Sequence, residues 1–407
     1  MSNTPIKIGY CLSLSGGLAA NGQTARLAHQ VWQERVNARG GLLGRDVELI
    51  CVDDKSDATT VAGIYEKLLS EEKVDLLLGG YGNNSISPAM PLVIANEKFL
   101  VGLMGLGVNI DFEYDRFFAM IPTGTDPNSA LTEGFFETAS KQTPRPTTVA
   151  IVAADAPFSK NPILGARANA AKNGLDVVSE TKYPLTTTDF GPYVREAQQS
   201  SPDILFYCAY LNDSVGLIRA IAESEMNPLL VGGAMIGPQS SAVQTQLGSV
   251  INGIVNYEYW LPVPAMNFPG VQDLITDYQR RAKGTLADEL GYYVAPFAYA
   301  QAQVLEQAVE ATGGLNDAEL ADCAREATFS TVVGDVAFGR LGEWEVPRVL
   351  TVQFRGIRSS DIADFAKPEA RVVVAPASYA SGELVVRTAR PPRPDERPRL
   401  RRDRPEH

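Results

Sequence analysis

Short, continuous apolar runs alternate along this chain with amphipathic segments of helical period. The first apolar run, 6–14, breaks at a Ser-Gly-Gly turn over residues 15–17. Beyond the turn, apolar residues recur at spacings of three and four, as on one face of a helix; they are Ala25, Ala28, Trp32 and Val36. A second apolar run, 47–52, ends on Asp53-Asp54. Strand, glycine-rich turn, helix and strand in this order predict one βαβ unit.

The same alternation continues well beyond this unit. Continuous apolar runs are typical of strands buried in parallel sheets. We expect further strands at residues 74–78, 99–103, 148–153, 204–210 and 229–232. Helical periods lie between them, as at Val61, Ile64 and Leu68, where Asp57 is the expected N-cap. One sheet holding every strand would be unusually large. The pattern therefore predicts an α/β protein with two doubly wound lobes.

The composition limits the functions open to this chain. Its 407 residues are 45% apolar, enough for two cores, and no apolar run reaches the ~18 residues of a membrane-spanning helix. The net charge of −12 argues against nucleic acid as a partner, because binding phosphates needs a basic face. The stretch 387–407, however, holds eight arginines, five prolines and four acids. We expect 362–407 to be an extension ending in a disordered Arg/Pro-rich tail, solvated rather than bound to an acidic partner.

The residues that carry chemistry are too few and too scattered for an enzyme. His29 is the one histidine outside the tail, so a nucleophilic Ser or Cys has no base beside it. Adjacent strand residues such as Asp53 and Asp54 point to opposite faces, which favours a turn or capping role. No dinucleotide or P-loop fingerprint is present. The cysteines form no CxxC pair and are expected to be buried thiols; they are Cys11, Cys51, Cys208 and Cys323. Whether Cys11 and Cys51 bond is left open. We expect no catalytic residue, metal or cofactor.

Loops at the carboxyl ends of strands are better candidates, because open α/β sheets bind ligands there. The loop after residue 78 leads into a helix expected to begin near Pro88, whose N-terminus favours an anion or a carbonyl group. The candidate residues in this loop are Tyr81, Asn83, Asn84 and Ser85. The alternative is that Asn84 or Ser85 only caps the helix. A second loop, 104–107, would bring backbone amides close to a ligand at Gly105 and Gly107.

The order of these segments resembles that of the type I periplasmic solute-binding proteins, and above all the Leu/Ile/Val-binding and amide-binding components of ABC importers. The resemblance rests on the Ser-Gly-Gly turn and on Asn-Ala-Arg-Gly-Gly-Leu-Leu-Gly-Arg at 37–45, Val-Asp-Asp at 52–54, Lys-Tyr-Pro at 182–184 and Thr-Asp-Phe at 188–190. It implies three crossovers between the lobes, with the ligand cleft between them. We place the crossovers near 121–122, 253–256 and 331–334. Lobe I would then be 5–121 plus 254–330, and lobe II 122–253 plus 331–356.

The resemblance also implies how lobe I would hold a ligand. In the amino-acid-binding members, the two loops described above bind the ligand carboxylate. Asn83 and Asn84 fall where those members have serines, and Gly107 falls where they have a threonine. The segment from Ser15 to Asn21 would form one lip of the cleft.

In lobe II the resemblance points away from an amino acid. Phe158 and Tyr210 fall on tyrosines that close over the ligand in the amino-acid binders. Ala234 falls on the acid that anchors the ammonium group, and a buried, unpaired ammonium costs several kcal/mol. Asp155 or Asp213 could replace that acid, although both also fit turn or capping roles. We therefore expect a small carboxylate or amide without an α-ammonium group, held between aromatic walls.

The function implied by the resemblance is binding without turnover. The protein would be the substrate-binding component of an ABC importer, capturing a small carboxylate, amide or amino-acid-like solute by lobe closure and presenting it to a membrane permease. Residues 1–5 have neither the basic nor the apolar region of an export signal. We expect a periplasmic location if a signal has been removed, and a cytoplasmic one otherwise. The alternative is a cytoplasmic ligand sensor of the amide-responsive type on the same fold.

Overall fold

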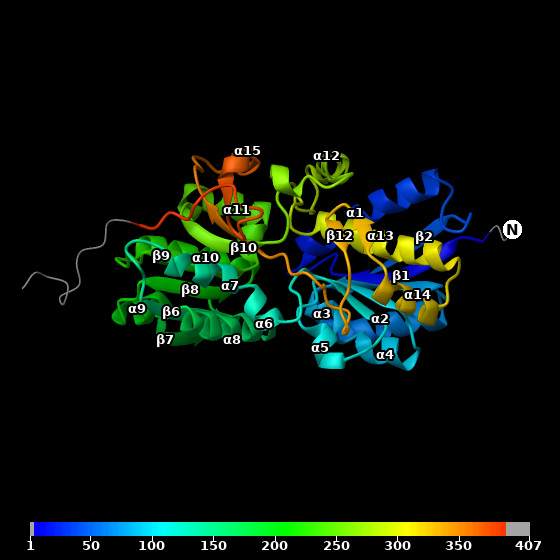
Figure 1. The fold of residues 1–407 in the computed structure, drawn as a ribbon, viewed down its shortest axis with the longest axis horizontal. Coiled ribbons are helices and arrows are strands. Elements are labelled where there is room, and N and C mark those ends of the chain that lie inside the picture. The colour runs from blue at the N-terminus through cyan, green and yellow to red at the C-terminus, as the bar shows by residue number, and fades with distance from the viewer. Residues whose placement is uncertain (1–3, 388–407) are drawn as a thin grey trace, which may run out of the picture.

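The computed structural model of this protein describes residues 4–387, apart from the side chains of Pro157, Phe158 and Asn212. Two lobes lie side by side and are joined by connecting segments at the middle of the molecule (Figure 1). Each lobe has its own sheet, covered by helices on both faces. The predicted two-lobed α/β fold is confirmed.

Lobe I is built on a five-stranded parallel sheet of order β2-β1-β3-β4-β5. Its strands are β1 Ile6–Leu12, β2 Val47–Asp53, β3 Leu76–Tyr81, β4 Leu100–Leu103 and β5 Phe117–Met120. Its helices are α1 Ala19–Ala38, α2 Ala58–Ser70, α3 Asn83–Ile86, α4 Met90–Ala95, α5 Val108–Phe112, α12 Val271–Ala282, α13 Ala295–Thr312 and α14 Asp317–Glu326. The helix expected near Pro88 is split into α3 and α4. Asp57 caps α2 by accepting from the Thr59 N–H, as predicted.

Helices α1 and α13 pack together over one face of this sheet. The predicted apolar face of α1 is fully buried at Ala25, Ala28 and Trp32. His29 lies in this interface, where its Nε2 is 3.0 Å from Gln301 Oε1. Gln301 in turn donates to the carbonyl oxygens of Gly79 in β3 and Val101 in β4. Burial lowers the pKa of His29 to about 4, so the imidazole is neutral and has a structural role.

Lobe II is built on a seven-stranded sheet of order β14-β13-β10-β9-β8-β6-β7, in which β13 and β14 run antiparallel to their neighbours. Its strands are β6 Thr148–Ala154, β7 Asp176–Tyr183, β8 Ile204–Ala209, β9 Leu230–Met235, β10 Ile254–Glu258, β13 Leu350–Phe354 and β14 Arg371–Ala375. Its helices are α6 Pro127–Ala130, α7 Glu133–Ser140, α8 Pro157–Lys172, α9 Gly191–Gln199, α10 Leu211–Glu223, α11 Ser241–Leu247 and α15 Ile362–Phe365.

The second crossing between the lobes lies later than the predicted 253–256. Residues 254–258, assigned to lobe I from the sequence, form β10 and pair with β9 and β13 in the second sheet. The Asn256 side chain holds them there, because its amide donates to the Met235 carbonyl and accepts from the Met235 N–H. The chain therefore returns to lobe I only after Glu258.

The third crossing also lies later than the predicted 331–334. The hairpin of β11 Phe329–Thr331 and β12 Gly334–Val336 packs on α13 of lobe I. Further on, the Gly342 carbonyl still accepts from the Ala119 N–H in β5 at 2.8 Å. The chain reaches lobe II only when β13 begins at Leu350, because these contacts keep it on lobe I until then.

The predicted extension from 362 is partly wrong. Strand β14 pairs antiparallel with β13 and becomes the edge of the second sheet. The mostly apolar run Arg371–Ala375 explains this, since three of its five residues are buried there. The Arg/Pro-rich stretch 388–407 lies outside the described residues.

The cysteines and acids build no metal site in residues 4–387, where no group of three or more His, Cys, Asp or Glu could hold an ion. All four cysteines are free thiols. Cys51 is opposite Tyr10 in the register of β1 and β2, so Cys11 points to the other face of the sheet and the two thiols do not meet. No helix in the described part is long and apolar enough to cross a membrane.

Candidate ligand-binding site

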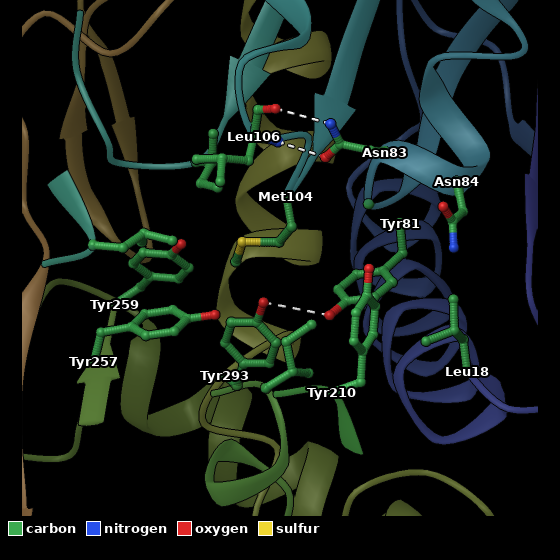
Figure 2. A pocket seen from close by; sticks show the side chains of 14 residues that line it. Leu18, Tyr81, Asn83, Asn84, Met104, Leu106, Tyr210, Tyr257, Tyr259 and Tyr293 are labelled. Atoms are coloured by element: carbon green, nitrogen blue, oxygen red, sulfur yellow. Dashed lines mark hydrogen bonds between the residues drawn. The ribbon is translucent and has the colours of Figure 1, made fainter. Parts of the chain in front are cut away.

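A pocket opens between the lobes at the carboxyl ends of β3, β4, β8 and β9, with further walls from the crossings (Figure 2). It encloses about 620 Å³, part of which is open to solvent. Its lining residues are Leu18, Tyr81, Gly82, Asn83, Asn84, Met104, Leu106, Ile121, Leu131, Tyr210, Ile236, Tyr257, Tyr259 and Tyr293. Both lobes contribute, so relative movement of the lobes opens or closes this pocket.

Five tyrosines give the pocket its character. Tyr81 ends β3, Tyr210 follows β8, Tyr257 lies in β10, Tyr259 follows β10 at the second crossing, and Tyr293 precedes α13. The rings of Tyr259 and Tyr293 stack with centroids 5.8 Å apart, and Tyr81 meets Tyr293 edge-on at 6.3 Å. Flat apolar faces of this kind suit a flat or apolar ligand.

The tyrosine hydroxyls form a short chain of neutral donors. Asn21 Nδ2 donates to the Tyr81 hydroxyl at 2.6 Å. That hydroxyl donates to the Tyr293 hydroxyl at 3.3 Å (Figure 2). Burial raises the pKa of Tyr81 to about 12, and it raises the pKa values of Tyr257 and Tyr293 well above the ordinary value of a phenol. The phenols therefore keep their protons at neutral pH. Asn21, a predicted site residue, lies behind Tyr81 and holds it in place.

Asn83 links the two predicted loops of lobe I. Its amide donates to the Leu106 carbonyl at 2.8 Å and accepts from the Leu106 N–H at 2.9 Å (Figure 2). Both hydrogen-bonding ends of the amide are therefore committed within the protein. Asn84 is exposed, lines the same pocket, and makes no side-chain hydrogen bond to another described residue. Its amide is the one that remains available to a ligand.

We expect Asn83→Ala to lower the free energy of unfolding by about 1–2 kcal/mol, because two partly buried hydrogen bonds to Leu106 are lost. The matched variant Asn84→Ala removes an exposed amide next to it and should stay within about 0.5 kcal/mol of the wild type. Urea unfolding of the three proteins measures both values. Equal losses of stability in the two variants would contradict the conclusion that the Asn83 side chain holds the two loops together.

Two predicted site residues, Ser15 and Ser85, do not line the pocket. Ser85 Oγ donates to Asp54 Oδ2 at 2.5 Å, and Ser13 Oγ donates to Asp54 Oδ1 at 2.6 Å. Ser15 Oγ donates to Asp53 Oδ2 at 2.7 Å. The acids at the end of β2 thus take up these hydroxyls and fix the first loop, which is the turn role expected of Asp53 and Asp54.

The glycines of the second loop shape the pocket from behind. A Cβ at Gly105 would lie 2.7 Å from Ile86 Cδ1, so a larger residue here would require the Ile86 side chain to move. Gly107 has a φ of +74° and begins α5. Their neighbours Met104 and Leu106 form the wall instead, and Figure 2 shows Met104 pointing toward the tyrosine rings.

Of the residues considered in lobe II, Tyr210 lines the pocket and Ala234 does not. Ala234 is fully buried in β9, opposite Cys208. Ile236 lies two residues further on and reaches the pocket, so position 234 is one step deeper along the strand. Phe158 belongs to α8, and its side chain lies outside the described part of the structure.

An acid lies in the chamber that adjoins this pocket. Asp213 lines that chamber, which shares Leu18, Asn84 and Tyr210 with the tyrosine pocket. Asp213 Oδ2 accepts from the Tyr183 hydroxyl at 2.6 Å, whereas its buried Oδ1 has no partner among the described residues. Asp155, the other acid considered from the sequence, is exposed and lines neither space.

Sequence reasoning missed three of the five tyrosines. Tyr257 lies in β10, Tyr259 follows it at the second crossing, and Tyr293 precedes α13. The sequence pattern predicts no strand or helix at these three positions. A usable signal was present, because Tyr257-Glu-Tyr-Trp260 and Tyr292-Tyr293 concentrate aromatic residues in two short stretches. Such clusters at a connection favour an interface or a ligand wall over a solvated loop.

A family model described as "Periplasmic binding protein" matches residues 5–343 of this chain. The chain belongs to the periplasmic binding protein family. Among curated relatives of this periplasmic binding protein, the Leu/Ile/Val-binding protein homolog 8 of Brucella abortus (strain 2308) is 24% identical, over 86% of this chain and 88% of its own length.

Solved structures share the fold of this periplasmic binding protein. The branched-chain amino acid transporter substrate binding protein LivJ of Streptococcus pneumoniae, in complex with isoleucine, superposes with a TM-score of 0.74 at 18% identity, covering 92% of this chain and all of its own. An ABC transporter solute binding protein of R. palustris, in complex with benzoate, has a TM-score of 0.72 at 17% identity, covering 88% of this chain and 95% of its own. The same architecture thus accepts both an amino acid and an aromatic acid.

Proposed function

We propose that this protein is the solute-binding component of an ABC importer and that its tyrosine-lined pocket takes a small aromatic carboxylate. One observation carries the choice of solute: among the described lining residues there are five tyrosines and no Asp, Glu, Lys, Arg or His. The benzoate complex of the R. palustris protein supports a solute of this class on the same fold.

Neutral donors would hold the carboxylate group. The Asn84 side-chain amide and the protonated phenols are the donors that line the pocket. Stacked and edge-on tyrosine rings would enclose the aromatic part, where burial of apolar area is favourable.

An α-ammonium group would find no carboxylate among the described lining residues of this pocket, only the weaker attraction of the tyrosine ring faces. Sealing it between tyrosine rings without a carboxylate would cost several kcal/mol. Asp213 offers one unpartnered oxygen, but only in the adjoining chamber, and its other oxygen is already bonded to Tyr183. This arrangement supports an acid without an amino group over leucine, isoleucine or valine.

Closure of the lobes would complete the site and create the surface that a permease reads. Contacts across the cleft support closure: the Ser241 N–H at the start of α11 donates to Asp288 Oδ2 at 2.6 Å. At another point, Gly107 of lobe I lies close to Asn161 of α8. A Cβ added to Gly107 would be 3.4 Å from the Asn161 Nδ2. The partner would be a membrane permease, and the compartment the periplasm.

Isothermal titration calorimetry with benzoate and with leucine tests this proposal. We expect benzoate to bind in the micromolar range or tighter and leucine to give no measurable heat. Asp213→Asn is the control for the adjoining chamber, and it should leave benzoate binding within about threefold, because a distant substitution changes binding by less than ~0.7 kcal/mol. Tight binding of leucine that Asp213→Asn abolishes would overturn the choice of solute.

A further inference from the structure

Arg348 carries a buried positive charge away from the tyrosine pocket. Its side chain belongs to the third crossing and the residue is only 7% exposed. Within residues 4–387, neither its Nε nor its Nη2 has a hydrogen-bond partner. Burial lowers its pKa, and the hydroxyl of Tyr379 offsets only part of that effect. A guanidinium taken out of water without an acceptor is costly and calls for a counter-charge.

Two aromatic rings pack on this guanidinium. The Arg348 Cζ is 5.0 Å from the ring centroid of Phe268 and 5.2 Å from that of Trp344. Nε and Nη2 share one edge of the guanidinium, which is the edge that grips two oxygens of a carboxylate or similar anion at once. The Trp344 Nε1 is also buried and has no partner in the described part of the chain.

We propose that Arg348 and Trp344 form a second binding site, specific for a small oxyanion. Arg348 Nε and Nη2 and Trp344 Nε1 are buried donors that have no partner among the described residues, and unpartnered donors favour an anion with at least two oxygens over a cation. The position is a junction of connections between lobes: the Arg348 N–H donates to the Pro122 carbonyl of the first crossing at 2.8 Å, and Phe268 follows the second. A bound oxyanion would tie these segments together and stiffen the hinge.

Thermal unfolding of the full chain in acetate, at constant ionic strength against chloride, tests the site. A ligand that binds only the folded state raises Tm in a saturable way. For the wild type we expect acetate to raise Tm by about 2 °C or more relative to chloride, as binding worth ~1 kcal/mol does. A rise with no saturation, equal in acetate and chloride, or no rise at all, would overturn the proposal.

Four variants locate the effect. Arg348→Met removes the guanidinium, and Trp344→Phe removes only the indole N–H. Both variants should therefore lose most of the rise in Tm caused by acetate. Arg340→Met is the matched control, because Arg340 is exposed on the same segment and should keep the response. Tyr293→Ala removes a wall of the tyrosine pocket and should also keep it, which separates this site from the solute site. A full acetate response in Arg348→Met would contradict the assignment.

Discussion

Replacing Tyr293 by alanine is expected to weaken benzoate binding by at least ~30-fold, because truncating a buried aromatic anchor costs about 2 kcal/mol or more. Tyr293 is 8% exposed and is the ring on which Tyr259 stacks and against which Tyr81 packs. Its loss removes the common neighbour of both walls. The same change should lower the free energy of unfolding by about 3 kcal/mol, as for other buried aromatic residues. Calorimetry and urea unfolding measure the two effects.

Tyr293→Phe separates the ring from its hydroxyl. It keeps both ring contacts and removes the hydroxyl that accepts from Tyr81 and also interacts with Tyr257. We expect benzoate binding to fall by no more than about fivefold, the size of one neutral hydrogen bond. A loss as large as that of the alanine variant would show that the hydroxyl and not the ring face holds the solute.

Two buried groups should make the stability of this protein depend on pH in opposite directions. Burial lowers the pKa of His29 to about 4 from 6.5, and it raises the pKa of Glu258 to about 7 from 4.5, although Arg371 at 3.2 Å opposes that rise. Stability increases with pH wherever the unfolded chain binds more protons than the folded one. His29 meets this condition between pH 4 and 6.5. Glu258 meets the reverse condition between pH 4.5 and 7.

The two contributions therefore oppose each other between pH 4.5 and 6.5. His29 stabilises the folded protein above pH 6.5 and loses this effect as pH falls toward 4; Glu258 stabilises it below pH 4.5 and loses the effect as pH rises toward 7. Each shift corresponds to about 3 kcal/mol across its window. Neither trend is expected to dominate in the wild type.

Single variants should expose each trend. Across pH 4.5–6.5, Glu258→Gln should become more stable with rising pH, because only His29 still titrates there. His29→Gln, which keeps a donor toward Gln301 Oε1, should become less stable with rising pH. Urea unfolding at four pH values measures the slopes, and the double variant is the control in which both slopes vanish. Parallel pH profiles for the wild type and both single variants would refute this account.

Much of the fold follows from local pattern. Strands β1, β3 and β4 and helix α1 are apolar runs or faces whose burial is required by their own sequence. The crossings do not follow in this way. Asn256 is polar in the middle of β10, and only its hydrogen bonds to the Met235 backbone show that it belongs to the second sheet. Strand β14 likewise exists because β13 offers it an edge.

The pocket residues, too, could be predicted from the sequence only in part. Tyr81, Asn83, Asn84 and Tyr210 stand at strand ends, so their place at the cleft follows from strand order, and all four line the pocket. The hydroxyls of Ser15 and Ser85 were equally well placed in the sequence, yet Asp53 and Asp54 take them up. Pairings between a loop hydroxyl and a distant acid depend on three-dimensional contacts. The placement of Tyr257, Tyr259 and Tyr293 in the same pocket depends on such contacts as well.

We propose that the tyrosine-lined pocket accepts an aromatic acid and rejects the same acid bearing an α-ammonium group. Phenylacetate and phenylglycine differ in that group alone, so calorimetry with this pair isolates its cost. We predict that phenylacetate binds and that phenylglycine binds at least ~100-fold more weakly, because an unpaired buried ammonium costs several kcal/mol. Equal or tighter binding of phenylglycine would contradict the account.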